Sequence, residues 1–147
     1  MLNKKFKIVL FLLLILLVFS FNLSAVEAEV YNSPEAFTRF IYDNYAQENF
    51  AEVYQRFVPE LKRILQQDDY LDFQNENFKK YKLEYTEIEV GKAETVKFDK
   101  IKKQFSYADE FGDFFKLKVS YLIKFNRFGS REKESEKIVY LRKINAQ

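Results

Sequence analysis

The chain has 147 residues, with 24 Lys or Arg against 22 Asp or Glu, and it contains no cysteine, histidine or tryptophan. The absence of cysteine excludes disulfides, thiolate metal sites and a lipid-modified cysteine, and therefore a lipoprotein. The absence of histidine removes the side chain that most often serves as an acid or base at neutral pH. Stability must come from packing, for which 17 Phe and 10 Tyr supply large apolar areas.

Residues 1–28 have the pattern of a secretory signal peptide. Lysines near the start precede an apolar stretch at 8–21 that is interrupted at its end by Ser20. Its core of about 13 apolar residues is shorter than the roughly 20 that span a membrane. Small side chains at Val26 and Ala28 predict cleavage before Glu29, and Ala25 offers a second possible cut. We therefore expect an exported protein, secreted or in the cell envelope, with an uncleaved membrane anchor as the alternative.

Cleavage would leave a domain at 29–147 with equal numbers of basic and acidic residues. The formal net charge of +2 thus belongs to the signal segment. It gives no reason to expect a nucleic acid or an anionic membrane as a partner. The remaining length suits one domain with one hydrophobic core.

Helical spacing of apolar residues dominates the first part of this domain. Ser33 and Pro34 are typical of a helix start, and an apolar stripe predicts a helix over 33–47. A second stripe over 50–65 predicts another helix packed against the first. Pro59 interrupts the second stripe, so that helix either kinks there or ends before it and restarts with this proline in its first turn.

Strand-like patterns follow a polar segment. Residues 66–77 predict a loop, which leads into a short helix over 75–81. Alternation over 83–90 predicts a strand with a bulge near Thr86. The apolar residues among the lysines of 95–107 predict a second, irregular strand.

The clearest strand is predicted over 115–125, where apolar side chains share one face and mostly polar ones the other. A turn at 109–113 precedes it, and a turn around Gly129 leads into a closing strand within 132–145. That last segment has three apolar residues on one face, Ile138, Tyr140 and Ile144. The fold class predicted is α+β, with two or three N-terminal helices packed on a curved antiparallel sheet of about four strands.

This order of elements, with residues 49–62 (NFAEVYQRFVPELK) and 76–81 (ENFKKY), resembles the NTF2-like (cystatin-like α+β) superfamily. More narrowly, it resembles small exported bacterial members of uncharacterised function. The resemblance spans about 33–144 and implies a cone whose helices and curved sheet enclose a pocket. Members use that pocket for ligands, catalysis or dimerisation, or fill it with side chains. The fold alone therefore implies no activity.

Aromatic residues expected to approach the cone interior form the candidate ligand pocket: Tyr54, Phe57, Tyr85, Tyr121 and Phe125. Aromatic rings with hydroxyl groups suit an apolar or sugar-like ligand, and the alternative is that they are plain core. No catalytic residue is predicted, because no inward-facing carboxylate stands out.

Two charged groups are predicted to be solvated surface. Asp68, Asp69 and Asp72 offer oxygen atoms of the kind that Ca²⁺ prefers, but their spacing matches no calcium loop. No metal or cofactor is therefore predicted. Outward-facing lysines of 115–125, opposite lysines within 97–103 on a neighbouring strand, have an anionic polymer or lipid headgroup as an alternative partner. These outward lysines are Lys116, Lys118 and Lys124.

The sequence thus favours an exported, non-enzymatic domain that binds a small apolar or sugar-like ligand, or a protein partner, at the cell envelope. One alternative is a small pocket enzyme of the same fold, which needs a buried carboxylate in a water-accessible cavity. The other is a structural homodimer, which needs exposed apolar residues such as Leu122 on the outer face of the sheet.

Overall fold

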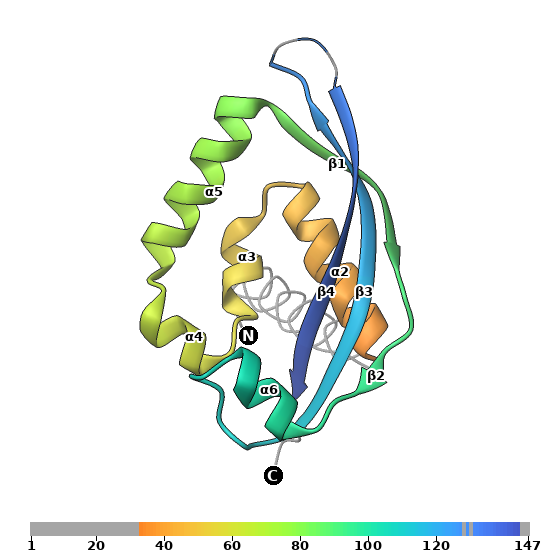
Figure 1. The fold of residues 1–147 in the computed structure, drawn as a ribbon. Coiled ribbons are helices and arrows are strands. Elements are labelled where there is room, and N and C mark those ends of the chain that lie inside the picture. Colours follow the sequence, from red (N-terminus) through yellow and green to blue (C-terminus); the bar gives the residue numbers. More distant parts are fainter. Residues whose placement is uncertain (1–32, 128, 130, 145–147) are drawn as a thin grey trace, which may run out of the picture. The chain divides into compact units, whose positions relative to one another are not determined.

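The computed structural model describes residues 33–127, 129 and 131–144 (Figure 1). The chain divides into two units, residues 1–33 and residues 34–147, and the second contains all the elements described below. The predicted signal segment lies outside the described residues. Within the described part, no helix combines the length and apolar character needed to cross a membrane.

Four helices precede the first strand, and a fifth lies between the second and third strands. The helices are α2 (Pro34–Ala46), α3 (Phe50–Gln55), α4 (Pro59–Ile64), α5 (Gln67–Tyr81) and α6 (Phe98–Gln104). The strands are β1 (Leu83–Val90), β2 (Glu94–Thr95), β3 (Asp113–Phe125) and β4 (Arg131–Lys143). The predicted α+β class is confirmed, but the described part has more helices than the two or three expected.

β3 forms the middle of an antiparallel sheet, and the other three strands all pair with it. β4 pairs with β3 along its whole length, from Asp113 opposite Lys143 to Phe125 opposite Arg131. β1 and β2 follow one another along the other edge of β3. Figure 1 shows the long β3–β4 hairpin twisting along its length. β4 is therefore an edge strand of the sheet.

Local signals explain how the first helices and the first strand are placed. α2 begins at Pro34, and the Thr38 hydroxyl donates a 2.8 Å hydrogen bond to the Pro34 carbonyl. At Pro59 the chain takes the second of the two predicted routes, since α3 has ended and α4 begins with this proline. The predicted bulge in β1 is confirmed, because the pairing register shifts between Thr86 and Glu89.

The segment predicted as a loop at 66–77 is helical, because α5 covers nearly all of it. Tyr70 and Phe78 are both buried, and they lie eight residues apart, which places them on one helix face. Between them, Gln74 accepts a 2.7 Å hydrogen bond from the Tyr45 hydroxyl. The polar middle of this stripe hid its period, so that prediction was wrong.

The strand predicted over 95–107 is also wrong, since β2 contributes only two residues and α6 follows. Phe98, Ile101 and Phe105 stand at positions i, i+3 and i+7, which is helical spacing. Ile101 is 3 % exposed and packs in a cluster with Phe114 of β3. Burial of this stripe against the sheet favours the helix over an irregular strand.

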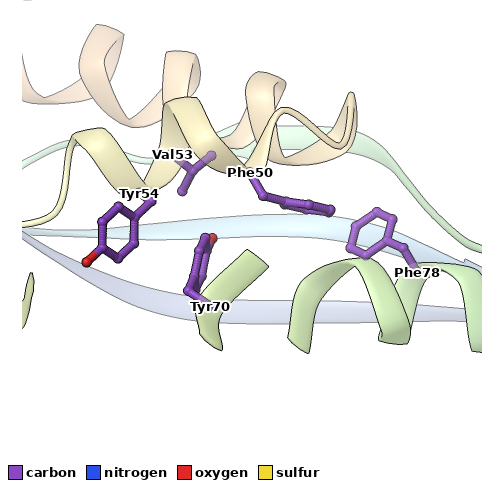
Figure 2. Close-up of a cluster of buried hydrophobic side chains, with 5 residues drawn as sticks. All are labelled: Phe50, Val53, Tyr54, Tyr70 and Phe78. Carbon is purple, nitrogen blue, oxygen red and sulfur yellow. The ribbon is translucent and has the colours of Figure 1, made fainter. Parts of the chain in front are cut away.

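The main core is a cluster of aromatic rings between α3 and α5. Figure 2 shows Phe50 and Tyr54 of α3 directed toward Tyr70 and Phe78 of α5. The rings of Phe50 and Phe78 meet edge to face with centroids 4.8 Å apart. Tyr85 of β1 stacks on Phe78 and so joins this cluster to the sheet. These contacts fill the space between α3, α5 and β1.

Candidate ligand-binding site

A cavity of about 360 Å³ lies among α2, α3, α4, α6 and the C-terminal half of β4. Its wall is mainly apolar, with Phe37 from α2, Phe57 from the turn after α3, Phe105 at the end of α6 and Ile138 from β4. Ile138 is 52 % exposed, so the cavity reaches the solvent beside the edge strand. This volume falls within the range of small-molecule sites.

Ring contacts and one hydrogen bond fix α6 and the loop after it beside the cavity. The Phe105 ring meets Tyr140 of β4 edge to face at 5.2 Å, and the Phe98 ring lies 5.7 Å from that of Phe114. Both contacts fix α6 against the sheet. The Lys102 ammonium donates a 2.9 Å hydrogen bond to the Ala108 carbonyl, which holds the loop after α6 beside the cavity.

A buried ion pair at the cavity wall joins α4 to β4. The Arg142 guanidinium donates from Nη1 to Glu60 Oε1 at 2.7 Å and from Nη2 to Oε2 at 2.9 Å. The two side chains are only 5 % and 8 % exposed, respectively. Such two-point pairs are strong and fix both partners in orientation. The restart of the helix at Pro59 places Glu60 in the first turn of α4, where it faces this arginine.

The pKa of the Glu60 carboxyl lies below its usual range, chiefly because of the hydrogen bonds from Arg142. Burial acts in the opposite direction and raises this pKa, but less strongly. Glu60 is therefore a carboxylate at neutral pH, and it neutralises Arg142 within the wall.

The third guanidinium nitrogen of Arg142, Nε, is buried and finds no hydrogen-bond partner among the described residues. A buried donor left in this state costs free energy. A second arginine of the wall, Arg56, bonds Glu52 Oε1 through Nη2 at 2.6 Å. Its guanidinium also lies 5.6 Å from the centre of the Phe40 ring. Each arginine of the wall thus has a carboxylate beside it, so the charges in the wall are balanced.

The five residues predicted to line the pocket lie in different places. Phe57 lines the cavity described above, whereas Phe125 lines a separate hollow near the β3–β4 turn. Tyr54 is buried beside Phe57, and its hydroxyl donates to the Leu65 carbonyl at 2.8 Å. Tyr85 and Tyr121 pack together in the core with ring centroids 5.2 Å apart. The structure thus gathers two pairs of these residues rather than one ring of five.

Sequence reasoning missed Glu60 and Arg142. No inward-facing carboxylate stood out in the sequence, yet Glu60 is buried; it looked like an ordinary acid in the first turn of a helix. Arg142 did carry a signal, since it falls between Tyr140 and Ile144 on the face that the sequence marks as apolar. A charged residue in such a register indicates a buried charge with a partner.

The charged groups predicted as solvated surface lie on the exterior. Lys116 and Lys118 bond Glu94 and Glu136 on neighbouring strands at 2.8 and 2.9 Å. The lysines expected to face them belong mainly to α6, so that part of the prediction was wrong. Asp68 and Asp69 lie in the first turn of α5, where negative charge is favourable. Within the described residues, no three potential metal-ligating side chains come together.

Comparison with known proteins gives no relative for this chain. No protein-family model matches it, and neither a curated protein sequence nor a solved structure does. A functional assignment therefore has to start from the cavity and its ion pair.

Proposed function

We propose that the domain is a non-enzymatic binding module that takes a small apolar ligand into the cavity among α2, α3, α4, α6 and β4. The observation that carries this proposal is the cavity itself, about 360 Å³ in volume and walled by aromatic and aliphatic side chains with two buried charged groups. Ligand sites in proteins commonly combine such an apolar wall with few polar groups.

The proposal includes an exported protein and an NTF2-like arrangement of helices and sheet. Export rests on the basic and apolar pattern of residues 1–28, and the family rests on the resemblance over 49–62 and 76–81. Neither inference is needed for ligand binding, because the cavity belongs wholly to the described unit.

Binding is better supported than catalysis at this cavity. A general acid or base works best with a pKa near the operating pH, whereas the bonds from Arg142 lower the pKa of Glu60. Both Glu60 oxygens are already occupied by the arginine. Glu60 is thus suited to holding the wall together rather than to moving protons.

A homodimer through the sheet receives less support than ligand binding. Alternating charges over 131–137 make the exposed edge of β4 a poor partner for another strand. The outer face carries the ion pairs of Lys116 and Lys118, which favour a solvated surface. Leu122, the residue expected to mark a dimer face, is only partly exposed.

The chain has no tryptophan, so a single introduced one gives an unambiguous fluorescent reporter. We would place it at Ile138, which lines the cavity and is 52 % exposed, and titrate the full chain with decane and with 2-decanone. The matched control carries Phe73→Trp on α5, at a site that is 63 % exposed and not part of the cavity wall. A saturable change in emission for Ile138→Trp alone supports the proposal, whereas no saturable change with either compound overturns it.

A further inference from the structure

The free edge of β4 borders the cavity. β4 pairs with β3 alone, and no described strand lies along its other side (Figure 1). Five consecutive residues of this strand, from Ile138 to Arg142, line the cavity. Successive side chains of a strand point to opposite faces of the sheet, so a wall that includes both sets must follow the edge between them. The backbone of 138–142 therefore faces the cavity.

The hydrogen bonds of β3 show which backbone groups of β4 point outward. On the side of β1 and β2, the Lys118 carbonyl accepts a 2.8 Å hydrogen bond from the Gly91 N–H, and the Phe114 carbonyl accepts one of equal length. In an antiparallel sheet, successive residues direct their N–H and C=O groups to alternate sides of the strand. The backbone of Leu117 is therefore directed toward β4, where its partner is Val139.

Ile138, Tyr140 and Arg142 consequently direct their backbone N–H and C=O groups away from β3, along the cavity. Within the described part of the chain, none of these backbone groups has a hydrogen-bond partner. Unpaired groups at the edge of a sheet form a template for a further strand. Charged residues guard this edge over 131–137, but the residues from Ile138 to Leu141 are uncharged. The unguarded part of the edge is thus the part that borders the cavity.

We propose that the cavity takes a short apolar peptide in an extended conformation, which adds a strand to β4 along 138–142. This inference rests on the proposed function and names the chemical class of the ligand. The alternate side chains of such a strand enter the cavity on the two sides of β4. On one side Val139 and Leu141 belong to a core cluster, and on the other Tyr140 packs against Phe105 of α6. In this binding mode main-chain hydrogen bonds give affinity, and the pockets for side chains give specificity.

The charges of the wall select a peptide with uncharged side chains. The charged groups that line the cavity in the described residues are already paired, Arg142 with Glu60 and Arg56 with Glu52. A charged side chain of the peptide would therefore be buried without a partner, which is costly. Valine, leucine and similar side chains meet the same apolar wall without that cost.

The binding test uses a five-residue peptide of alternating valine and leucine, blocked at both ends and extended by a serine-rich tail for solubility. Calorimetry measures its affinity for the full chain. The matched control is the same peptide with its five valine and leucine amides N-methylated, which keeps the side chains and removes the backbone donors. We expect the N-methylated peptide to bind at least about tenfold more weakly, because several hydrogen bonds to β4 are lost. Glutamate or lysine in place of the central valine should weaken binding by a similar factor.

Backbone hydrogen exchange in the unmodified chain locates the bound peptide. The N–H groups of Ile138, Tyr140 and Arg142 should exchange at least about tenfold more slowly with the peptide than without it, because they become hydrogen-bonded. Val139 is an internal control, since its N–H already points to β3. Glu134 is a second control, because its N–H also points outward but the residue is not part of the cavity wall.

The outcomes separate this inference from the proposed function. If decane, 2-decanone and the peptide all fail to bind, the proposed function fails and this inference fails with it. If the small compounds bind and the peptide does not, the cavity binds apolar molecules but the peptide class is wrong. Equal affinities for the peptide and its N-methylated form, or unchanged exchange at Ile138, Tyr140 and Arg142, would overturn the addition of a strand to β4. Equal binding of the charged peptides would overturn the selection for uncharged side chains.

Discussion

The aromatic core and the cavity are built from the same kinds of side chain and differ in how completely they are filled. In the core, Phe50 is 1 % exposed and has aromatic rings of α2 and α5 against its edges. In the cavity, Phe57 and Phe105 face a space of about 360 Å³. Aromatic content therefore does not distinguish a core from a site, and the difference comes from the backbone around it.

The elements that surround the two regions differ in length. The core lies against α5, a helix of 15 residues. The cavity is bounded by α4 and α6, with six and seven residues, and by the edge strand β4. Such short helices present only one or two turns to their neighbours and cover the end of a sheet incompletely.

Polar groups give a second contrast between the regions. The hydroxyl of Tyr54 bonds a backbone carbonyl, and that of Tyr45 bonds Gln74, so the protein itself satisfies both. In the cavity wall, Arg142 retains a buried donor without a partner in the described residues. The protein itself thus satisfies these two core hydroxyls, whereas the cavity wall keeps a buried donor without a partner among the described residues.

The largest expected effect is on the core. Phe50→Ala should lower the free energy of unfolding by about 3–5 kcal/mol, because it leaves a void in a filled cluster. Phe57→Ala is the matched comparison and should cost less than half as much, since that ring already borders open space. Urea unfolding measures both. Equal losses would mean that the cavity is as tightly filled in solution as the core.

The next effect concerns the ion pair of the cavity. Arg142→Met should cost about 3 kcal/mol at pH 7, because it leaves the Glu60 carboxylate buried without its partner. The double variant Glu60→Gln/Arg142→Met should recover much of that loss. If the single and double variants unfold alike, the pair does not stabilise the wall as the structure indicates.

The stability contributed by the Glu60–Arg142 ion pair depends on pH. The folded-state pKa of Glu60 is lowered, so its contribution is present above the ordinary value of 4.5 and is lost as pH falls through the lower folded-state pKa. In Arg142→Met the unpaired acid takes up a proton more easily, and the penalty of this variant should therefore shrink between pH 7 and pH 4. Urea unfolding at the two pH values tests this.

The fold was more accessible from the sequence than the site. Apolar spacing located α2 and the β3–β4 hairpin, and the phase change near Thr86 located the bulge of β1. Apolar spacing did not locate α5 correctly, because polar Gln74 interrupts its buried stripe. It also did not identify α6, because the short apolar stripe at 98–105 also fits an irregular strand. Short segments of this kind are settled by the surface they pack against.

The cavity depends on long-range contacts that one sequence does not display. Glu60 and Arg142 lie 82 residues apart and meet only because α4 packs across the end of β4. The five aromatic residues predicted to line one pocket do not surround a single space, and two of them, Tyr85 and Tyr121, pack against each other and beside Tyr42. Spacing indicated which residues are buried, but not where packing stops short of filling the space.

A fourth prediction tests the backbone that positions Arg142. Gly112 has φ of 92°, and a Cβ there would collide with the Lys143 carbonyl oxygen beside Arg142. Gly112→Ala should therefore destabilise the chain by about 1–3 kcal/mol and weaken binding of the apolar probes, while the core contacts persist. Gly129→Ala is the control, because its φ is similar at 87° but no atom of the described residues stands within 4 Å of the added carbon. Equal costs in the two variants would show that the collision is relieved easily.

The smallest effect at neutral pH is expected for a tyrosine of the core. Burial is the main cause that raises the pKa of Tyr42 to about 12 from its ordinary value of 10.0, and Tyr121 and Tyr85 add to it. A raised folded-state pKa gives stability that is complete below pH 10 and is lost as the pH rises toward 12. Tyr42→Phe keeps the ring beside Tyr121 but cannot ionise, so the midpoint of alkaline unfolding should rise while stability at pH 7 changes little. Circular dichroism during an alkaline titration would show this shift. An unchanged midpoint would mean that ionisation of another group causes the alkaline unfolding. Tyr70 of α5 would be the next residue to replace, because burial raises its pKa to about 12 as well.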